Sequence, residues 1–387
     1  MRLTPGMLIL AWSFFGVESD CLAYPGFIGY GYSNCVSCHF NPYGNGPLTD
    51  YGRGVAASEI AARPIYASKR TTDEDLSSQA GFLGSKELPS WIRPALSYRG
   101  MQMVTGVGTS QSLSQWLNMQ AEGSLTVRNT KETFVASGTF GYVPVPQTKK
   151  SQTNISTWIS REHYVGVRLN KELGAYAGLM DTVFGIRVAD HNAYLRSKTF
   201  IDKNDQSHGL LIHYGGRKMD LGLHVLAGNL FQKESLRQKG ASLMGEFDVG
   251  KDWRVGASAL YTRGTFRSRQ MFAVHTRVGV AEGSSVLAQF GTIREDPVIQ
   301  GAPLGGYSFF QWTNRLIRGL NLLATLEWYA ADFSKTGPRS YRAGPSLQWF
   351  PMQRLELRAD LLGTRQTGSD SLETDFYTLL AQVHVWL

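Results

Sequence analysis

Residues 375–387 read Asp375-Phe376-Tyr377-Thr378-Leu379-Leu380-Ala381-Gln382-Val383-His384-Val385-Trp386-Leu387. Their side chains alternate: one face would carry Tyr377, Leu379, Ala381, Val383, Val385 and Leu387, and the other Thr378, Gln382, His384 and Trp386. Successive side chains of a β-strand point to opposite faces, so this segment predicts a strand with one apolar face. At 13 residues it is also long enough for a tilted strand to cross a membrane.

The same alternation runs through most of the chain from Trp91 onward. Residues 117–128 place Leu117, Met119, Ala121, Gly123, Leu125 and Val127 on one side, against Asn118, Gln120, Glu122, Ser124, Thr126 and Arg128 on the other. Strands are predicted at 91–105, 113–128, 131–143, 157–170, 173–182, 206–215, 218–231, 238–249, 252–263, 269–281, 284–293, 305–317, 320–333, 339–350, 353–365 and 374–387. A soluble all-β domain is the alternative, but its strands are typically shorter.

The segments between these strands alternate in length. Tight turns are predicted near 128–131, 170–172, 215–218, 249–252, 281–284, 318–320 and 350–353, with longer loops such as Pro144–Ser156, Thr182–Asp205 and Glu295–Leu304 between them. Bacterial outer-membrane barrels have an even number of strands, short periplasmic turns and longer external loops. The sequence therefore predicts a mainly β protein in the bacterial outer membrane, with an antiparallel transmembrane barrel of about 16 strands over residues 91–387 and both barrel ends in the periplasm.

One of the predicted loops has two interpretations. Val183–Asn204 includes Phe184-Gly185-Ile186-Arg187-Val188-Ala189-Asp190-His191-Asn192-Ala193-Tyr194-Leu195-Arg196. It can fold into the lumen as a constriction that carries Arg187, His191 and Arg196, or it can be an ordinary external loop. Its length is compatible with both.

Composition and the first residues indicate an exported protein. Arg2, the apolar run Met7–Val17 and Cys21-Leu22-Ala23 predict a signal peptide over residues 1–23, with the mature chain beginning at Tyr24. The apolar run is too short to span a bilayer. The net charge of +8 includes no Lys/Arg-rich run, so nucleic acid is not an expected partner. The lipid of the outer membrane is the expected partner of the apolar strand faces.

Residues 24–90 form a small module before the barrel. Within it, Cys35-Val36-Ser37-Cys38-His39 has the Cys-x-x-Cys-His pattern of c-type haem attachment. Two thiols one helical turn apart can form thioethers with the two vinyl groups of one haem, and the adjacent histidine can ligate its iron. The motif predicts one covalent haem c on Cys35 and Cys38, with His39 as an axial ligand. A redox dithiol or a local disulfide is the main alternative, and a structural zinc site is weaker because no second Cys or His pair lies nearby.

The rest of this module lacks an obvious second iron ligand. Short helices are predicted at Val55–Ala62 and Asp73–Ala80, followed by a linker at Ser85–Pro89. Residues 40–90 contain neither Met nor His, so the iron would be five-coordinate, or its sixth ligand would come from the barrel or from a partner. Strand parity points His213, His224, His275 and His384 into the lumen. His384 and His213 are the candidate distal ligands, because both fall near the periplasmic rim.

A Cys-x-x-Cys-His module followed by a β-barrel resembles the outer-membrane porin–cytochrome proteins. The specific part of the resemblance covers Gly29–Arg53. It implies electron exchange through Cys35 and Cys38 as haem attachment sites and His39 as the axial ligand. One haem at one rim does not bridge a hydrocarbon core of about 30 Å, so the expected partners are periplasmic electron carriers and a multihaem cytochrome.

Four functions are compatible with these features. The preferred hypothesis is electron transfer by a c-type haem at the periplasmic mouth of the barrel, without enzymatic activity. The runner-up is a porin-like solute channel whose haem module is a plug, a gate or a redox sensor. An enzyme acting on peroxide would need distal hydrogen-bonding groups that the module does not offer. The fourth is a structural barrel whose motif binds nothing.

Overall fold

The computed structural model describes residues 24–44, 46–65, 67–84, 88–107, 112–142, 158–201, 205–297, 303–335, 337–368 and 372–387. The expected signal peptide, residues 1–23, lies outside the described residues, as do the loop Pro144–Ser156 and part of the linker Ser85–Pro89. No described helix is long and apolar enough to cross a membrane.

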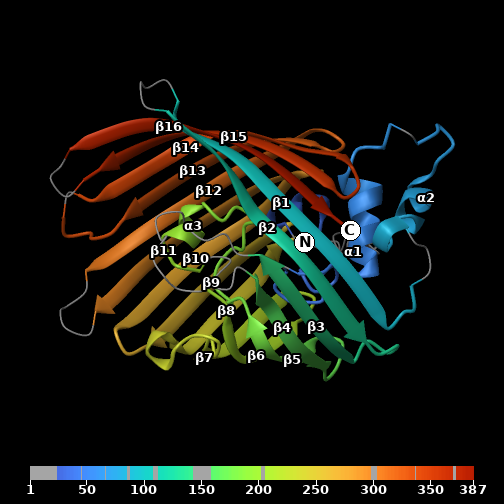
Figure 1. Ribbon diagram of the computed structural model, residues 1–387, viewed down its shortest axis with the longest axis horizontal. Coiled ribbons are helices and arrows are strands. Elements are labelled where there is room, and N and C mark those ends of the chain that lie inside the picture. The colour runs from blue at the N-terminus through green and yellow to red at the C-terminus, as the bar shows by residue number, and fades with distance from the viewer. Residues whose placement is uncertain are drawn as a thin grey trace, which may run out of the picture.

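Sixteen antiparallel strands within the described ranges form one closed barrel (Figure 1). They are β1 (Ile92–Val107), β2 (Leu113–Arg128), β3 (Phe134–Tyr142), β4 (Trp158–Arg168), β5 (Leu173–Met180), β6 (Ser207–Gly215), β7 (Met219–Gly228), β8 (Lys239–Gly250), β9 (Trp253–Arg263), β10 (Arg267–Ala281), β11 (Ser284–Pro297), β12 (Leu304–Ile317), β13 (Leu320–Ala330), β14 (Arg339–Met352), β15 (Leu355–Thr367) and β16 (Glu373–Trp386). Each pairs with its neighbours in sequence, and β1 pairs with β16 to close the ring. Every predicted strand is present at its expected place.

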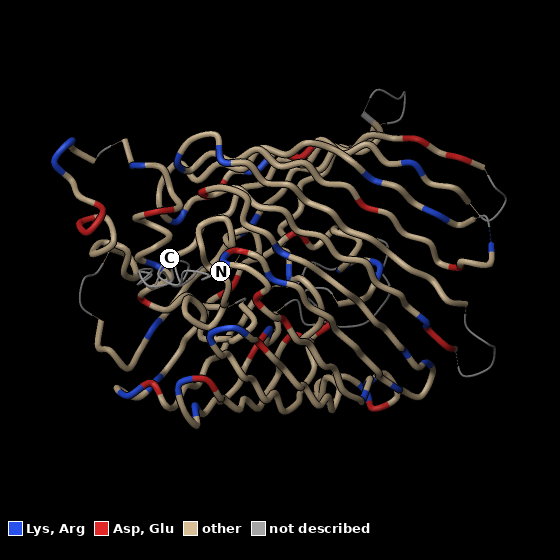
Figure 2. Tube along the Cα trace, turned by 180° about the vertical axis from the view of Figure 1, so that it is seen from behind, with Lys and Arg blue, Asp and Glu red and all other residues tan. Residues whose placement is uncertain are grey.

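The apolar face of each strand points outward, as a lipid-facing surface requires. On β10, Phe272 and Val274 are about half exposed, at 51% and 46%, whereas the next residue, His275, is 5% exposed. On β16, Tyr377 and Leu379 are exposed, and His384 faces inward, where it bonds to lumenal side chains. Buried ion pairs such as Arg277 with Glu246 and Arg342 with Glu327 face the interior, and Figure 2 shows basic and acidic residues near one another along the trace. The expected alternation is therefore the barrel's inside–outside pattern.

The first half of β2 departs from the predicted pattern. Arg99 pairs with Gln120, but Gly100 pairs with Asn118, so Met119 is an extra residue that forms a β-bulge. Because a bulge adds one residue, the alternation shifts, and the side chains that precede the bulge point to the opposite face from the predicted one. Leu117 and Met119 consequently pack inward, and Asn118 is exposed. The expectation that Leu117 and Met119 share a face with residues 121–127 was wrong for this reason.

The segment before the barrel has little regular structure. It contains 3-10 helix η1 (Pro25–Tyr30), α1 (Asp50–Val55), π-helical turn η2 (Ala56–Ile60), α2 (Asp73–Ser78) and the 3-10 turn η3 (Phe82–Gly84). The helix expected at Val55–Ala62 starts at Asp50 instead, because the Thr49 hydroxyl caps it by accepting from the Gly52 amide. The helix expected at Asp73–Ala80 is α2, with a capping box between Thr72 and Asp75.

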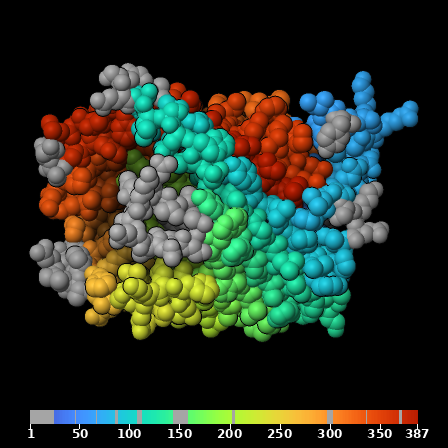
Figure 3. Space-filling model, in the orientation of Figure 1, coloured from blue at the N-terminus to red at the C-terminus, as the bar shows by residue number. Residues whose placement is uncertain are grey.

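The segment before the barrel lies at the barrel end that carries the tight turns. Figure 1 shows α1 and α2 beside the C-terminus, where β16 ends and β1 begins. The space-filling view places the blue residues of this segment against the same end (Figure 3). Two-residue turns join β8 to β9, β10 to β11, β12 to β13 and β14 to β15 at this end. This is the arrangement predicted for a periplasmic module.

Candidate functional site

Residues 24–44 and 46–62, here called the plug segment, lie inside the mouth of the barrel. Their hydrogen-bond partners belong to strands spread around the ring. The plug segment donates from the Arg53 guanidinium to the Pro94 carbonyl of β1 (2.7 Å), from Asn41 Nδ2 to Glu162 of β4, from the Ala62 amide to the Phe350 carbonyl of β14 (2.8 Å) and from the Tyr24 hydroxyl to Glu356 of β15 (3.0 Å). It accepts at the Ser33 carbonyl from Arg254 of β9 (3.1 Å) and Arg277 of β10 (3.0 Å). A segment held from so many directions crosses the opening.

The 3-10 helix η1 of the plug segment packs tightly against the backbone of the barrel wall. Gly29 of η1 accepts at its carbonyl from the Gly283 amide, at 2.8 Å. A Cβ atom at Gly29 would lie 2.5 Å from the Ser284 carbonyl oxygen and 2.7 Å from the Ser284 nitrogen. At Gly26, in the same turn, the nearest atom would be the Ser285 hydroxyl oxygen at 3.1 Å, which can rotate away. The position of η1 therefore requires glycine at residue 29.

The loop between β5 and β6 also enters the lumen. Its described part, residues 181–201, is called the lumenal loop and contains α3 (Tyr194–Ser197). It is held by lumenal side chains of five strands. Three loop amides donate to the wall: Gly185 to Ser258 (2.9 Å), Ile186 to Gln289 (2.7 Å) and Tyr194 to Glu327. Two wall arginines donate to loop carbonyls: Arg342 to Asn192 (2.7 Å) and Arg99 to Ala189 (3.3 Å). Of the two interpretations left open by the sequence, the lumenal constriction is correct.

Apolar packing holds this loop against one side of the barrel. Phe184, Ile186, Val188, Ala193, Leu195 and Ile201 form a buried cluster with inward-facing residues of β7 and of β9 to β12. Arg187 pairs with Asp181 within the loop. Burial alone would raise the pKa of the Asp181 carboxyl, but the Arg187 and Arg196 guanidinium groups outweigh it and hold the pKa below its usual value. Arg187 also donates to the Tyr43 carbonyl (3.4 Å), which links the lumenal loop to the plug segment.

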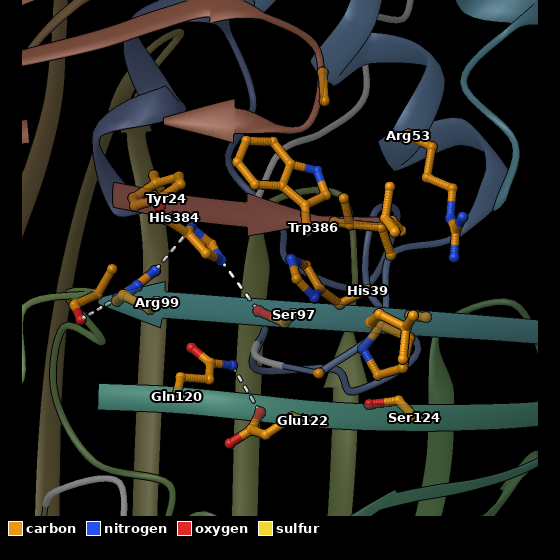
Figure 4. Close-up of a pocket in the computed structure, with 18 of the residues that line it drawn as sticks. Tyr24, His39, Arg53, Ser97, Arg99, Gln120, Glu122, Ser124, His384 and Trp386 are labelled. Carbon is orange, nitrogen blue, oxygen red and sulfur yellow. Dashed lines mark hydrogen bonds between the residues drawn. The ribbon is translucent and has the colours of Figure 1, made fainter. Parts of the chain in front are cut away.

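A cavity of about 230 Å³ remains between the plug segment, the lumenal loop and the wall formed by β1, β2 and β16 (Figure 4). His39 and His384 both line it, as do the three loop residues singled out in the sequence, Arg187, His191 and Arg196. The remaining lining has an apolar part, a cationic part and a polar part that includes the Glu122 carboxylate. Its apolar part includes Tyr24, Phe27, Leu48, Ile60, Phe350 and Trp386, and its cationic part includes Arg53 and Arg99.

The imidazole of His384 belongs to a cross-strand group. Glu356 and Arg99 are its register partners on β15 and β1. His384 Nδ1 lies 3.1 Å from Glu356 Oε2 and 3.1 Å from Arg99 Nη2, and Nε2 lies 3.2 Å from the Ser97 hydroxyl. When the Nδ1 proton is directed at the Glu356 carboxylate, Nε2 carries the lone pair and accepts from Ser97; Arg99, which can only donate, is then a close neighbour of Nδ1 and not its hydrogen-bond partner. Figure 4 shows Ser97 between His384 and His39.

The other lumenal histidines of the strands, His213, His224 and His275, are not among the residues that line this cavity. His213 faces the lumen as expected, but its Nε2 contacts both Asp220 oxygens at 3.2 Å and its ring packs edge-on against Tyr43. His275 bonds to Glu246 at 3.0 Å, and His224 is buried on β7. Of the two candidate distal ligands, the structure thus brings His384, and not His213, to the same cavity as His39.

The Cys35–His39 motif forms a turn within the plug segment. The amides of Cys38 and His39 donate to the Cys35 carbonyl at 3.2 and 3.0 Å, so the two cysteines lie one turn apart. Cys38 is buried in a cluster with Phe27, Ile60 and Phe350, three residues that also line the cavity. The described residues contain no group of three or more His, Cys, Asp or Glu side chains placed to hold a metal ion.

The lining matches the chemistry of a haem, the group that the motif implies. A haem is an apolar macrocycle with two carboxylates, and the described lining offers apolar side chains, guanidinium groups and three imidazoles, beside the carboxylate of Glu122. Arg99 is buried, and its Nε has no hydrogen-bond partner among the described residues, so it can donate to a carboxylate. The cavity is smaller than the roughly 300–1,000 Å³ of pockets for drug-sized ligands, so its walls would have to part to admit the group.

Ser97, Arg99 and Glu356 were not singled out from the sequence. Each lies on the polar side of an alternating strand, which is the one local signal they carry. Their importance comes from the register that places Arg99, His384 and Glu356 side by side across three strands. Register over the β1–β16 seam joins the two ends of the barrel, and only the closed fold reveals it.

No protein-family model and no curated protein sequence matches this chain. Among solved structures it is similar to the outer-membrane protein OmpT of Vibrio cholerae, with 11% identity, a TM-score of 0.58 and coverage of 76% of this chain and 97% of that one. It is also similar to the outer-membrane channel DcaP of Acinetobacter baumannii (10% identity, TM-score 0.56, 79% and 99% covered) and to an anion-selective porin from Comamonas acidovorans (8% identity, TM-score 0.54, 76% and 99% covered).

These likenesses establish the fold. They cover nearly the whole length of each known structure and about the share of this chain that the barrel occupies. The barrel is therefore of the porin type, as the sequence predicted, and the plug segment is additional to it. The three similar proteins are an outer-membrane protein, an outer-membrane channel and an anion-selective porin.

Proposed function

We propose that the protein is a porin-type channel of the bacterial outer membrane that its plug segment holds closed from the periplasmic side. The observation that carries this proposal is the ring of contacts from Pro94, Glu162, Arg254, Arg277, Phe350 and Glu356 to one segment. The lumenal loop narrows the same lumen from the opposite side. Passage of a solute would require the plug segment to move.

Two features suit a segment that can leave the mouth. Most of its anchors are single hydrogen bonds, each with a net value of about 1 kcal/mol, or roughly 1.5–3 kcal/mol where a charged group takes part. Its apolar cluster is small, with Phe27, Cys38, Val55 and Ile60 among its members. The strands, by contrast, are paired along their lengths with two neighbours each. The plug segment is therefore the part of the molecule with the lower local stability.

Recordings of ionic current across a planar bilayer test this function. The wild-type protein should stay closed for most of the time, and Gly29→Ala, which forces η1 away from Ser284, should show frequent steps of an open barrel. Gly26→Ala is the matched control, because its added Cβ meets only the hydroxyl of Ser285. Equal currents from all three proteins would contradict a closing role for the segment.

A second candidate function is electron transfer by a covalent haem c held by Cys35, Cys38 and His39. The observation that favours it is the shared cavity of His39 and His384 with its apolar and cationic walls. When bound, the haem would supply a redox-active iron close to the periplasmic surface, within reach of periplasmic electron carriers. A multihaem cytochrome would be needed to continue the path across the membrane core of about 30 Å.

Haem attachment is tested by producing the protein together with the haem-maturation machinery. The wild-type band should keep a haem stain on a denaturing gel, and Cys35→Ala/Cys38→Ala should lose it. A barrel that folds with both thiols but binds no haem would remove this second candidate. It would leave the plugged channel unaffected, because that proposal does not depend on the cofactor.

A further inference from the structure

We propose that His384 is the second axial ligand of the haem iron, supplied by the last strand of the barrel across the cavity from His39. This inference rests on the second candidate function, the covalent haem on Cys35 and Cys38. Its structural basis is that His39 and His384, which are far apart in the sequence, line one cavity, where His191 of the lumenal loop is the third imidazole. The plug segment alone provides no other histidine or methionine after His39.

The surroundings of His384 are those of a metal-binding imidazole. Histidine ligands commonly donate their second ring N–H to a carboxylate, which fixes the tautomer, orients the ring and makes the ligating nitrogen more basic. Glu356 Oε2 is in that position at 3.1 Å from Nδ1, and Glu356 is itself 1% exposed and bonded to Gln348 and Tyr24. Nε2 is then the ligating atom, and the Ser97 hydroxyl, 3.2 Å away, is the contact it would exchange.

The comparison with His213 shows what is special about this position. His213 also lies next to a carboxylate, Asp220, but the nitrogen that contacts it is Nε2 and the ring is covered by Tyr43. His213 does not line the cavity, whereas His384, Trp386 and the apolar residue Phe350 border it together. Of these two histidines, only His384 combines access to the His39 cavity with an oriented ring.

Ligation by His384 gives the strand a further role. A ligand from β16 would couple the plug segment to the seam where the barrel closes. The plug segment would then be held in the mouth by the iron as well as by its hydrogen bonds. Loading with haem should consequently slow proteolysis of the plug segment in the wild type, and should do so less in a variant without the His384 imidazole.

Absorption and electron paramagnetic resonance spectra of the haem-loaded protein test the ligand. The oxidised wild type should be low-spin and six-coordinate, His384→Leu should be high-spin, and His213→Leu should keep the wild-type spectrum. His384→Met should stay low-spin with a more positive reduction potential, because a Met/His pair raises the potential relative to two histidines. Glu356→Gln, which keeps the imidazole but removes its carboxylate, should also shift the potential upward.

The outcomes separate the inference from the function on which it rests. A wild-type protein without covalent haem overturns the haem function itself. A haem-bearing wild type that is high-spin, or a His384→Leu variant that remains low-spin, overturns the role of His384 and leaves the haem function standing. Should His384→Leu fail to assemble, the potential of His384→Met decides: a value equal to that of the wild type contradicts ligation.

Discussion

The contact between Gly29 and Ser284 gives a quantitative prediction for the docking of the plug segment. In Gly29→Ala the added methyl group would lie 2.5–2.8 Å from three backbone atoms of Ser284, none of which can rotate away. Overpacking of this kind costs about 1–3 kcal/mol. Since about 1.4 kcal/mol corresponds to a factor of ten, the undocked population should rise about 5- to 150-fold.

Labelling of Cys38 by a maleimide measures that population. Cys38 is a completely buried residue of the plug segment, so its thiol reacts only when the segment opens. In a Cys35→Ser background produced without haem attachment, the labelling rate follows the open population as long as closing is faster than the reaction. Gly29→Ala should label about 5- to 150-fold faster than its parent, and Gly26→Ala at nearly the parent rate. Equal rates for Gly29→Ala and Gly26→Ala would refute the docking of η1 against Ser284.

Three further predictions concern the stability of the barrel. Arg277→Met leaves the buried Glu246 paired with His275 and Arg254 only, and should lower the free energy of unfolding in urea by about 3 kcal/mol. Arg365→Gln, which breaks an exposed ion pair, should change this free energy little. Val274→Arg places a charge on the lipid-facing surface and should cost about 2–4 kcal/mol in a bilayer, measured in the same way. Burial alone would raise the pKa of the Asp50 carboxyl, but Arg93, with Arg128 and Arg53, lowers it below 3.8. The wild type should therefore be more stable than Asp50→Asn above pH 3.8, and the difference in unfolding free energy should vanish as the pH falls through the lower folded-state pKa.

The strands were predictable because their signal is local. A period of two is visible within any ten residues, and a barrel repeats it in every strand. The extra residue at Met119 was not predictable, since a bulge depends on the partner strand and leaves no mark in the alternation itself. The start of α1 was missed for a smaller reason: the capping residue Thr49 follows a Gly/Pro-rich loop and gives no periodic pattern.

The site was predictable in its parts and not in its assembly. The motif identified Cys35, Cys38 and His39, and parity placed His384 in the lumen. Nothing in the sequence indicates that Arg254 and Arg277 hold the Ser33 carbonyl, because these partners are more than 200 residues apart and the acceptor is a backbone atom. The choice between a lumenal and an external loop depended in the same way on contacts such as Ile186 with Gln289.

A reversible crosslink between the plug segment and the barrel wall tests whether this segment closes the channel. Asn41 and Glu162 are hydrogen-bonded across the mouth, so Asn41→Cys/Glu162→Cys in a Cys35→Ser/Cys38→Ser background should be joined by a short cleavable dithiol-reactive reagent. The crosslinked protein should pass no current in a planar bilayer, and cleaving the linker should restore brief openings. Failure of the two cysteines to crosslink, or full open-barrel current while they are joined, would contradict it.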